Sequence, residues 1–127
     1  MQLLGIKELE DKKLYKANQI VINGTPKIFF VKEDPGCFHR DILSAILIEN
    51  RLRYSTVEIF TGKGPALNGE GYAVKGMGGA ILLGEKHVLL FGNSFEYGID
   101  ISDKHAENLR EEELPDWEFT VTHIPKG

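Results

Sequence analysis

Two apolar runs in the second half of the chain, residues 80–83 and 87–91, constrain the fold more than any other feature. They read Ala-Ile-Leu-Leu and His-Val-Leu-Leu-Phe, and Gly84-Glu85-Lys86 separates them. Short apolar runs joined by such a connection are typical of a β-hairpin. Because nearly every position in both runs is apolar, we expect this hairpin to lie in the middle of a sheet that is covered on both faces.

The rest of the chain supplies further strands and two helices. Asn23-Gly24 lies between two β-branched and aromatic runs and predicts a second hairpin. Apolar residues at helical spacing after Pro35-Gly36 predict a helix that begins near Phe38 or His39. We expect the other elements to be short strands at 3–9, 19–22, 27–31 and 55–61, a mobile glycine-rich loop at 62–75, a helix at 103–114 with Ser102 as its N-cap, and a final strand at 117–122.

These elements predict an α/β (mixed) fold, with a single mixed β-sheet of about six strands and two main helices packed on it. A length of 127 residues, with no repeat or linker, predicts one domain over residues 1–127.

Composition narrows the class of protein. The formal net charge of −4 argues against a nucleic-acid partner, and we expect no membrane association because no apolar run is long enough to span one. Cys37 is the only cysteine, which suits a reducing compartment. We therefore expect a cytoplasmic monomer or small homo-oligomer.

His39 is the first candidate for chemistry. At the start of a helix, free backbone N–H groups and the positive end of the helix dipole favour an anion, and Arg40 adds a fixed positive charge. A histidine that titrates near neutral pH at such a place suits phosphoryl transfer. The alternative is a histidine at a helix start that is an ordinary solvated surface residue or a partner for a neighbouring strand.

Three other motifs point away from cofactors and from a serine nucleophile. The four histidines, at positions 39, 87, 105 and 123, lack the short spacings of a zinc site, so we expect no metal. Gly76-Met77-Gly78-Gly79 leads into a strand rather than a helix, which excludes a dinucleotide loop. Ser94 lacks the second glycine of a nucleophile elbow. We expect no cofactor.

Four segments in order resemble the phosphohistidine phosphatase (Janus/Ocnus) family. Phe38-His39-Arg40-Asp41-Ile42 resembles its aromatic-His-x-Asp-Ile stretch, and Gly78-Gly79-Ala80-Ile81 resembles its glycine-rich strand entry. Residues 91–98, Phe-Gly-Asn-Ser-Phe-Glu-Tyr-Gly, resemble its aromatic-Gly-x-Ser-x-x-Tyr-Gly loop, and Pro115-Asp116-Trp117-Glu118 its Pro-Asp-aromatic-Glu ending. The segments span roughly residue 27 to the end of the chain.

The resemblance implies a small mixed α/β domain that hydrolyses phosphohistidine, and in some members phospholysine, without a metal. It places His39 on the catalytic histidine and Lys27 on the phosphate-binding lysine. Ser94 and the N–H groups of Phe95 and Glu96 fall on the phosphate-binding loop.

Ala80 departs from the family pattern, because the family has a phosphate-binding arginine there. Arg40, Lys63 or Lys75 could replace that charge, and Ala80→Arg would be expected to restore it.

The resulting hypothesis is a metal-independent protein phosphatase with His39 as general base or nucleophile. Its substrates would be phosphohistidine-containing proteins or small phosphoramidates. A non-catalytic phospho-ligand or protein-binding domain that keeps the anion pocket is the alternative. We expect Lys27, His39 and Ser94 to meet in one shallow pocket.

Overall fold

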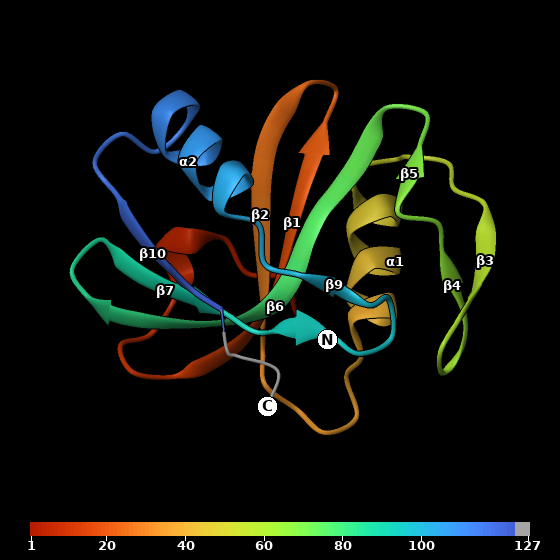
Figure 1. The fold of residues 1–127 in the computed structure, drawn as a ribbon, viewed down its shortest axis with the longest axis horizontal. Coiled ribbons are helices and arrows are strands. Elements are labelled where there is room, and N and C mark those ends of the chain that lie inside the picture. Colours follow the sequence, from red (N-terminus) through yellow and green to blue (C-terminus); the bar gives the residue numbers. More distant parts are fainter. Residues whose placement is uncertain (124–127) are drawn as a thin grey trace.

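The longest strand, β6 (Tyr72–Gly84), runs through the middle of the main sheet in the computed structural model, which describes residues 1–123 (Figure 1). Its antiparallel neighbours are β1 (Leu14–Ile22) and β7 (His87–Phe91). At the edges, β2 (Thr25–Lys32) pairs antiparallel with β1, and β10 (Glu118–Thr122) runs parallel to β7. The short β5 (Asn68–Gly69) also pairs with β6. This six-stranded mixed sheet confirms the predicted fold class.

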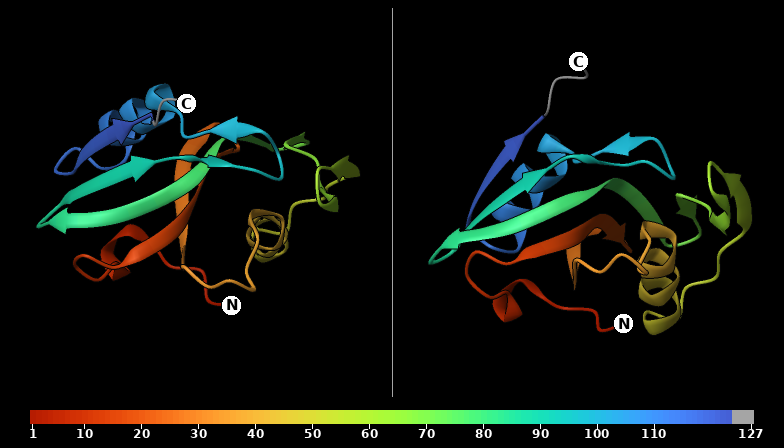
Figure 2. Two further views of the ribbon diagram at one scale, coloured as in Figure 1. Left: turned by 60° about the horizontal axis from the view of Figure 1, so that its bottom comes forward. Right: turned by 90° about the horizontal axis from the view of Figure 1, so that it is seen from below.

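The helices α1 (His39–Glu49) and α2 (Asp103–Glu112) lie on opposite faces of the sheet (Figure 2). Each face therefore has its own apolar core, and β1 contributes to both by alternation. Tyr15 and Ala17 belong to the core on the α2 side, whereas Ile20 and Ile22 belong to the core on the α1 side. The predicted covering of both faces is confirmed.

Both predicted hairpins are present. At the turn between β1 and β2, Asn23 has φ 48° and Gly24 has φ 83°, which is the left-handed backbone that a two-residue hairpin turn needs. The turn between β6 and β7 pairs Gly84 with His87. The helix starts are also as predicted: α1 begins at His39, and the Ser102 hydroxyl accepts a hydrogen bond from the backbone N–H of His105 at 3.1 Å.

Two local predictions are wrong. Residues 3–9 do not form a strand; they hold a short 3₁₀ helix, η1 (Ile6–Glu8), preceded by a single bridge between Leu4 and Phe30. Residues 62–75 are not an irregular loop, because they include β4 (Gly62–Pro65), β5 and the start of β6.

The hairpin of β3 (Thr56–Ile59) and β4 packs beside α1 as a separate small sheet. A Cβ atom on Gly64 would lie 2.6 Å from the Tyr97 hydroxyl oxygen and 3.0 Å from the Arg40 Cβ. The glycine therefore serves close packing rather than mobility. A third small sheet joins β8 (Asn93–Ser94) to β9 (Ile99–Asp100).

Within residues 1–123, no helix has the length and apolar character that crossing a membrane requires.

The glycine run of β6 is a packing requirement. A Cβ atom on Gly78 would lie 2.4 Å from the Phe91 carbonyl oxygen and 2.6 Å from an Ile101 side-chain carbon. A Cβ atom on Gly79 would lie 2.7 Å from the Phe91 ring. These positions let β6 lie against the chain that leaves β7, and a methyl group at either one has to push its neighbours away.

We predict that Gly78→Ala lowers the free energy of unfolding by about 1–3 kcal/mol, the usual cost of overpacking. Gly84→Ala is the matched control, because no atom lies within 4 Å of its would-be Cβ, and it should change stability by less than about 0.5 kcal/mol. Urea unfolding of both variants measures the difference. Equal stability of the two variants would contradict the packing role of Gly78.

Candidate functional site

A small pocket of about 250 Å³ opens where α1 begins. It gathers side chains from five parts of the chain: β1, the start of α1, the turn after β3, β8 and the turn after β8. The lining residues are Lys16, Phe38, His39, Thr61, Asn93, Phe95 and Glu96. The pocket therefore joins the helix start with the loop after β7, two of the segments that the sequence singled out.

His39 is oriented by the backbone of the central strand. Its ring Nε2 lies 3.0 Å from the carbonyl oxygen of Gly78. A carbonyl oxygen only accepts, so Nε2 carries the proton and Nδ1 keeps its lone pair. The side chain is 9% exposed, and this burial holds the pKa of His39 below its ordinary value of 6.5. The ring is therefore neutral at pH 7, as a general base or nucleophile must be.

Lys16, on β1, is the lysine that lines this pocket. Its ammonium donates to the carbonyl oxygen of Cys37 and lies 3.9 Å from a carboxylate oxygen of Glu33. It also lies 5.8 Å from the centre of the Phe38 ring. These contacts hold a positive charge at the mouth of the pocket beside His39.

Lys27 is not part of this pocket, so that sequence-based expectation is wrong. Lys27 is exposed on β2 and pairs with Ile20, whereas Lys16 pairs with Val31. The two lysines are thus four residues apart in register, or roughly 13 Å along the strands. Each lies on a strand before the helix, and the sequence alone did not show which strand position is level with His39.

Glu96 occupies the helix start. Its carboxylate accepts the backbone N–H of Arg40 at 3.2 Å, accepts the Thr61 hydroxyl, and lies 3.6 Å from the Arg40 Nε. The side chain is only 6% exposed. An internal carboxylate thus fills the place that we expected a phosphate to take, and the Arg40 guanidinium is already paired.

Arg40 also anchors the neighbouring small sheet. Its guanidinium donates to the Thr61 carbonyl at 3.1 Å and lies 5.2 Å from the centre of the Phe38 ring. Arg40 thus contacts three residues that line the pocket, Phe38, Thr61 and Glu96, but does not line it itself.

Ser94 and Phe95 have different positions in the loop. Ser94 is fully buried, and its hydroxyl accepts the backbone N–H of Tyr97 at 3.3 Å, so it holds the turn. Phe95 lines the pocket and is 71% exposed, with its ring packed edge-on against Phe60 at a centroid distance of 4.6 Å. Of the predicted group of Lys27, His39 and Ser94, the pocket therefore contains His39 and the neighbours of Ser94 in its loop, while Ser94 itself is buried and does not line the pocket.

Ala80 lies on the other side of the sheet. It is fully buried in the core on the α2 side, paired with Tyr15 and Leu90. An arginine at this position would place its charge in an apolar core and away from His39. The expectation that Ala80→Arg restores a phosphate contact is wrong for this geometry.

Three lining residues were missed by sequence reasoning. Lys16, Thr61 and Asn93 reach the pocket only because β1, the β3–β4 turn and β8 meet at the start of α1. Asn93 had a weak signal, since it lies in the motif around Ser94. No sequence pattern distinguishes Lys16 or Thr61 from the other polar residues near strand ends.

Among residues 1–123, no three His, Cys, Asp or Glu side chains lie close enough together to hold a metal ion. The histidines lie apart: His105 bonds to the Ile20 carbonyl under α2, and His87 bonds to Thr120 of β10.

No family model matches the chain, and no curated protein matches it either. The resemblance to phosphohistidine phosphatases therefore rests on the sequence motifs alone.

Two buried histidines predict a loss of stability in mild acid. Burial lowers the pKa of both His39 and His105 below 6.5. The unfolded chain therefore binds these protons at a higher pH than the folded chain does. Stability should be complete above about pH 6.5 and fall as the pH drops from there towards the lowered values. Urea unfolding at pH 7.5 and pH 5.5 measures this loss.

The loss should be smaller in His105→Gln, which removes one of the two groups, and unchanged in His123→Gln, whose side chain is exposed. An identical pH dependence in all three proteins would show that buried histidines are not its source.

We also predict that Glu96→Gln strengthens the binding of inorganic phosphate by about threefold to tenfold. Glutamine keeps the shape but removes the charge, which leaves the Arg40 guanidinium uncompensated. The shift of the melting temperature with phosphate concentration measures the affinity. Glu70→Gln, at an exposed position, is the control. Unchanged or weaker phosphate binding in Glu96→Gln would show that Arg40 does not face the anion site.

Proposed function

We propose that the protein is a metal-independent phosphatase that hydrolyses the P–N bond of phosphohistidine. The observation that carries the proposal is the neutral His39 ring, which Gly78 holds by Nε2 while Nδ1 keeps its lone pair. The Lys16 ammonium lines the same pocket, where it can neutralise phosphoryl oxygens. The motif resemblance supports the same assignment.

The chemistry needs only water. The water oxygen bonds to phosphorus while the P–N bond breaks, His39 Nδ1 takes a proton from the water, and the leaving nitrogen gains a proton. Orthophosphate and an unmodified histidine result. In the nucleophilic variant, Nδ1 bonds to phosphorus while the substrate P–N bond breaks and the leaving nitrogen gains a proton, and water then splits the new bond to release orthophosphate.

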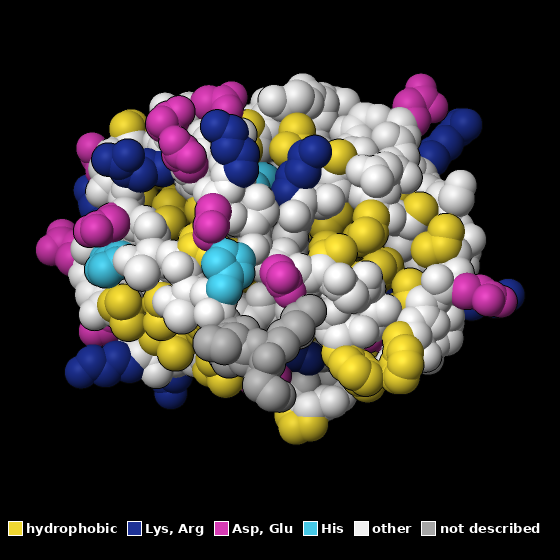
Figure 3. All heavy atoms as spheres, viewed as in Figure 1, with side chains coloured by type: hydrophobic (Ala, Val, Ile, Leu, Met, Phe, Trp, Pro, Cys, Tyr) yellow, Lys and Arg dark blue, Asp and Glu magenta, His cyan; other side chains and the backbone are white. Residues whose placement is uncertain are grey.

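Aromatic side chains favour an imidazole leaving group over an alkyl amine. Phe38 and Phe95 line the pocket, and Phe60 supports Phe95. Figure 3 shows apolar side chains gathered on the part of the surface over α1, β3 and β4, with few charged groups among them. A flat imidazole can stack on such rings, whereas the flexible chain of lysine cannot. Phosphohistidine is therefore the preferred substrate, with phospholysine and small phosphoramidates next.

The cellular compartment that we propose for this activity is the cytoplasm. The single Cys37 is buried and suits a cytoplasmic protein.

A non-catalytic domain that binds phospho-ligands is the second candidate. The pairing of Glu96 with Arg40 favours it, because this ion pair withholds the arginine from a developing charge. Such a domain would bind a phosphohistidine peptide and release it unchanged.

The test is dephosphorylation of a phosphohistidine peptide by wild type and three variants. His39→Ala should lower the rate about 10²–10⁴-fold, because it removes the base or nucleophile. Lys16→Met should lower the rate about 10²-fold, because it removes one charge that stabilises the transition state. Lys27→Met is the matched control and should retain wild-type turnover, since Lys27 is exposed away from the pocket.

A strong chelator should leave the wild-type rate unchanged, and circular dichroism should show that each variant is folded. A rapid alkaline quench with a peptide labelled in its phosphoryl group separates the two mechanisms, because only a nucleophilic His39 becomes labelled and its P–N bond survives in alkali. Binding of the peptide without turnover by wild type would favour the second candidate, and metal-restored activity after chelation would overturn the first.

A further inference from the structure

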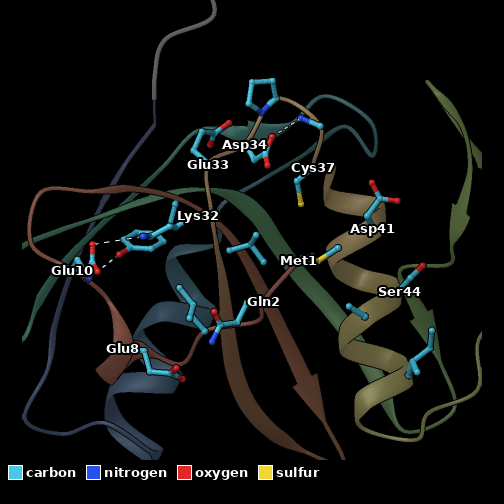
Figure 4. A pocket seen from close by; sticks show the side chains of 17 residues that line it. Met1, Gln2, Glu8, Glu10, Lys32, Glu33, Asp34, Cys37, Asp41 and Ser44 are labelled. Atoms are coloured by element: carbon cyan, nitrogen blue, oxygen red, sulfur yellow. Dashed lines mark hydrogen bonds and ion pairs between the residues drawn. The ribbon is translucent and has the colours of Figure 1, made fainter.

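A larger groove of about 1070 Å³ lies between the N-terminal segment, the end of β2 and α1 (Figure 4). One wall is a single face of α1, formed by Asp41, Ser44, Ala45 and Ile48 at helical spacing. Ile48 is 66% exposed, although it is one of the large apolar side chains of the helix. The opposite wall consists of the segment before η1, and the chain leaving β2 closes one end.

The charge of the groove is mostly negative. Its lining residues include Glu8, Glu10, Glu33, Asp34 and Asp41, against Lys32 as the one basic side chain among those that line it within residues 1–123. Lys32 lies 3.8 Å from Glu10, and Lys16 lies 3.9 Å from Glu33. The other three carboxylates accept hydrogen bonds from backbone N–H groups, and none of them has an ion-pair partner within residues 1–123. The groove therefore combines apolar surface with excess negative charge.

The groove borders the pocket of His39 at Cys37 and Phe38, which are neighbours in the chain. Cys37 lines the groove, and its carbonyl oxygen accepts the bond from Lys16, which lines the pocket. The next residues, Phe38 and His39, line the pocket itself. A peptide segment that extends from the pocket past Cys37 thus enters a groove whose negative charge is opposite to that of Lys16 in the pocket.

We propose that this groove binds a cationic, partly apolar peptide segment next to the phosphorylated residue of a protein substrate. The inference rests on the proposed function, which it deepens by naming the substrate class. A pocket of about 250 Å³ suits a phosphoryl group and one ring, whereas the groove has room for several side chains. Complementary charge favours lysine or arginine in the segment, and Ile48 offers contact to an apolar residue. A second copy of this chain is disfavoured by its own net charge of −4.

The test compares three phosphohistidine peptides that share the same central residues. The residues on either side of the phosphohistidine are lysine and leucine in the first peptide, glutamate and leucine in the second, and serine and glycine in the third. Wild type should show a kcat/KM about tenfold higher for the lysine-leucine peptide, mainly through KM, and added salt should reduce the advantage. The double variant Glu8→Gln/Glu10→Gln and the variant Ile48→Ser should lose most of it. Both Glu8 and Glu10 are exposed, so the fold should tolerate the change.

The matched control is Glu111→Gln/Glu112→Gln, which removes the same charge from exposed positions on α2. It should keep the preference of wild type. Turnover of phosphoramidate, which has no flanks, should be equal in all these proteins.

Fluorescence anisotropy with the unphosphorylated lysine-leucine peptide separates this inference from the proposed function. One outcome would support the groove as a peptide-binding site and contradict the proposed phosphatase activity. In it, no protein shows turnover, but wild type binds this peptide about threefold to tenfold more tightly than the groove variants do. Equal binding of the lysine-leucine and glutamate-leucine peptides would overturn the inference. So would an equal loss of affinity in the α2 control, or a change of oligomeric state in the groove variants without a change in peptide affinity.

Discussion

The close approach of β6 to the end of β7 is the constraint on which the site depends. Neither Gly78 nor Gly79 has room for a methyl group, because the Phe91 backbone or ring fills that space. The carbonyl oxygen of the same Gly78 lies 3.0 Å from the His39 Nε2 at the start of α1. A side chain at Gly78 would therefore disturb both the sheet and the orientation of the imidazole. The packing of the β6 backbone and the orientation of the His39 ring are therefore linked through Gly78.

Sequence patterns predicted the parts of the fold that local chemistry decides. The Asn23-Gly24 turn, the His39 helix start and the Ser102 cap depend on residues a few positions apart, and all three are present. The short strands β4 and β5 were missed, because their glycines serve close packing, Gly64 against Tyr97 and Gly69 against Tyr72, instead of flexibility. The site was predicted only in part. His39 and the loop around Ser94 had signals, but the choice of Lys16 over Lys27 depends on strand register, which no local pattern encodes.

Glu96 changes what the helix start offers to a ligand. Helix N-termini attract anions because their first N–H groups lack partners within the helix. Here the chain supplies its own anion, and the Arg40 N–H and the Thr61 hydroxyl both bond to it. An incoming phosphoryl group must then rely on Lys16 and the remaining pocket groups. The motif alone suggested an open anion site, and the side chain within that motif fills it.

The bridge between Leu4 and Phe30 also affects how the molecule behaves towards copies of itself. β2 is an edge of the main sheet, and edge strands can recruit strands from other molecules. The N–H and carbonyl of Phe30 point outward, and both bond to Leu4, at 3.0 Å and 2.7 Å. An invading strand would have to break these bonds before pairing in the middle of β2. The segment before η1 thus protects the protein against edge-to-edge aggregation, and a chain that lost this segment would expose the centre of an aggregation-prone edge.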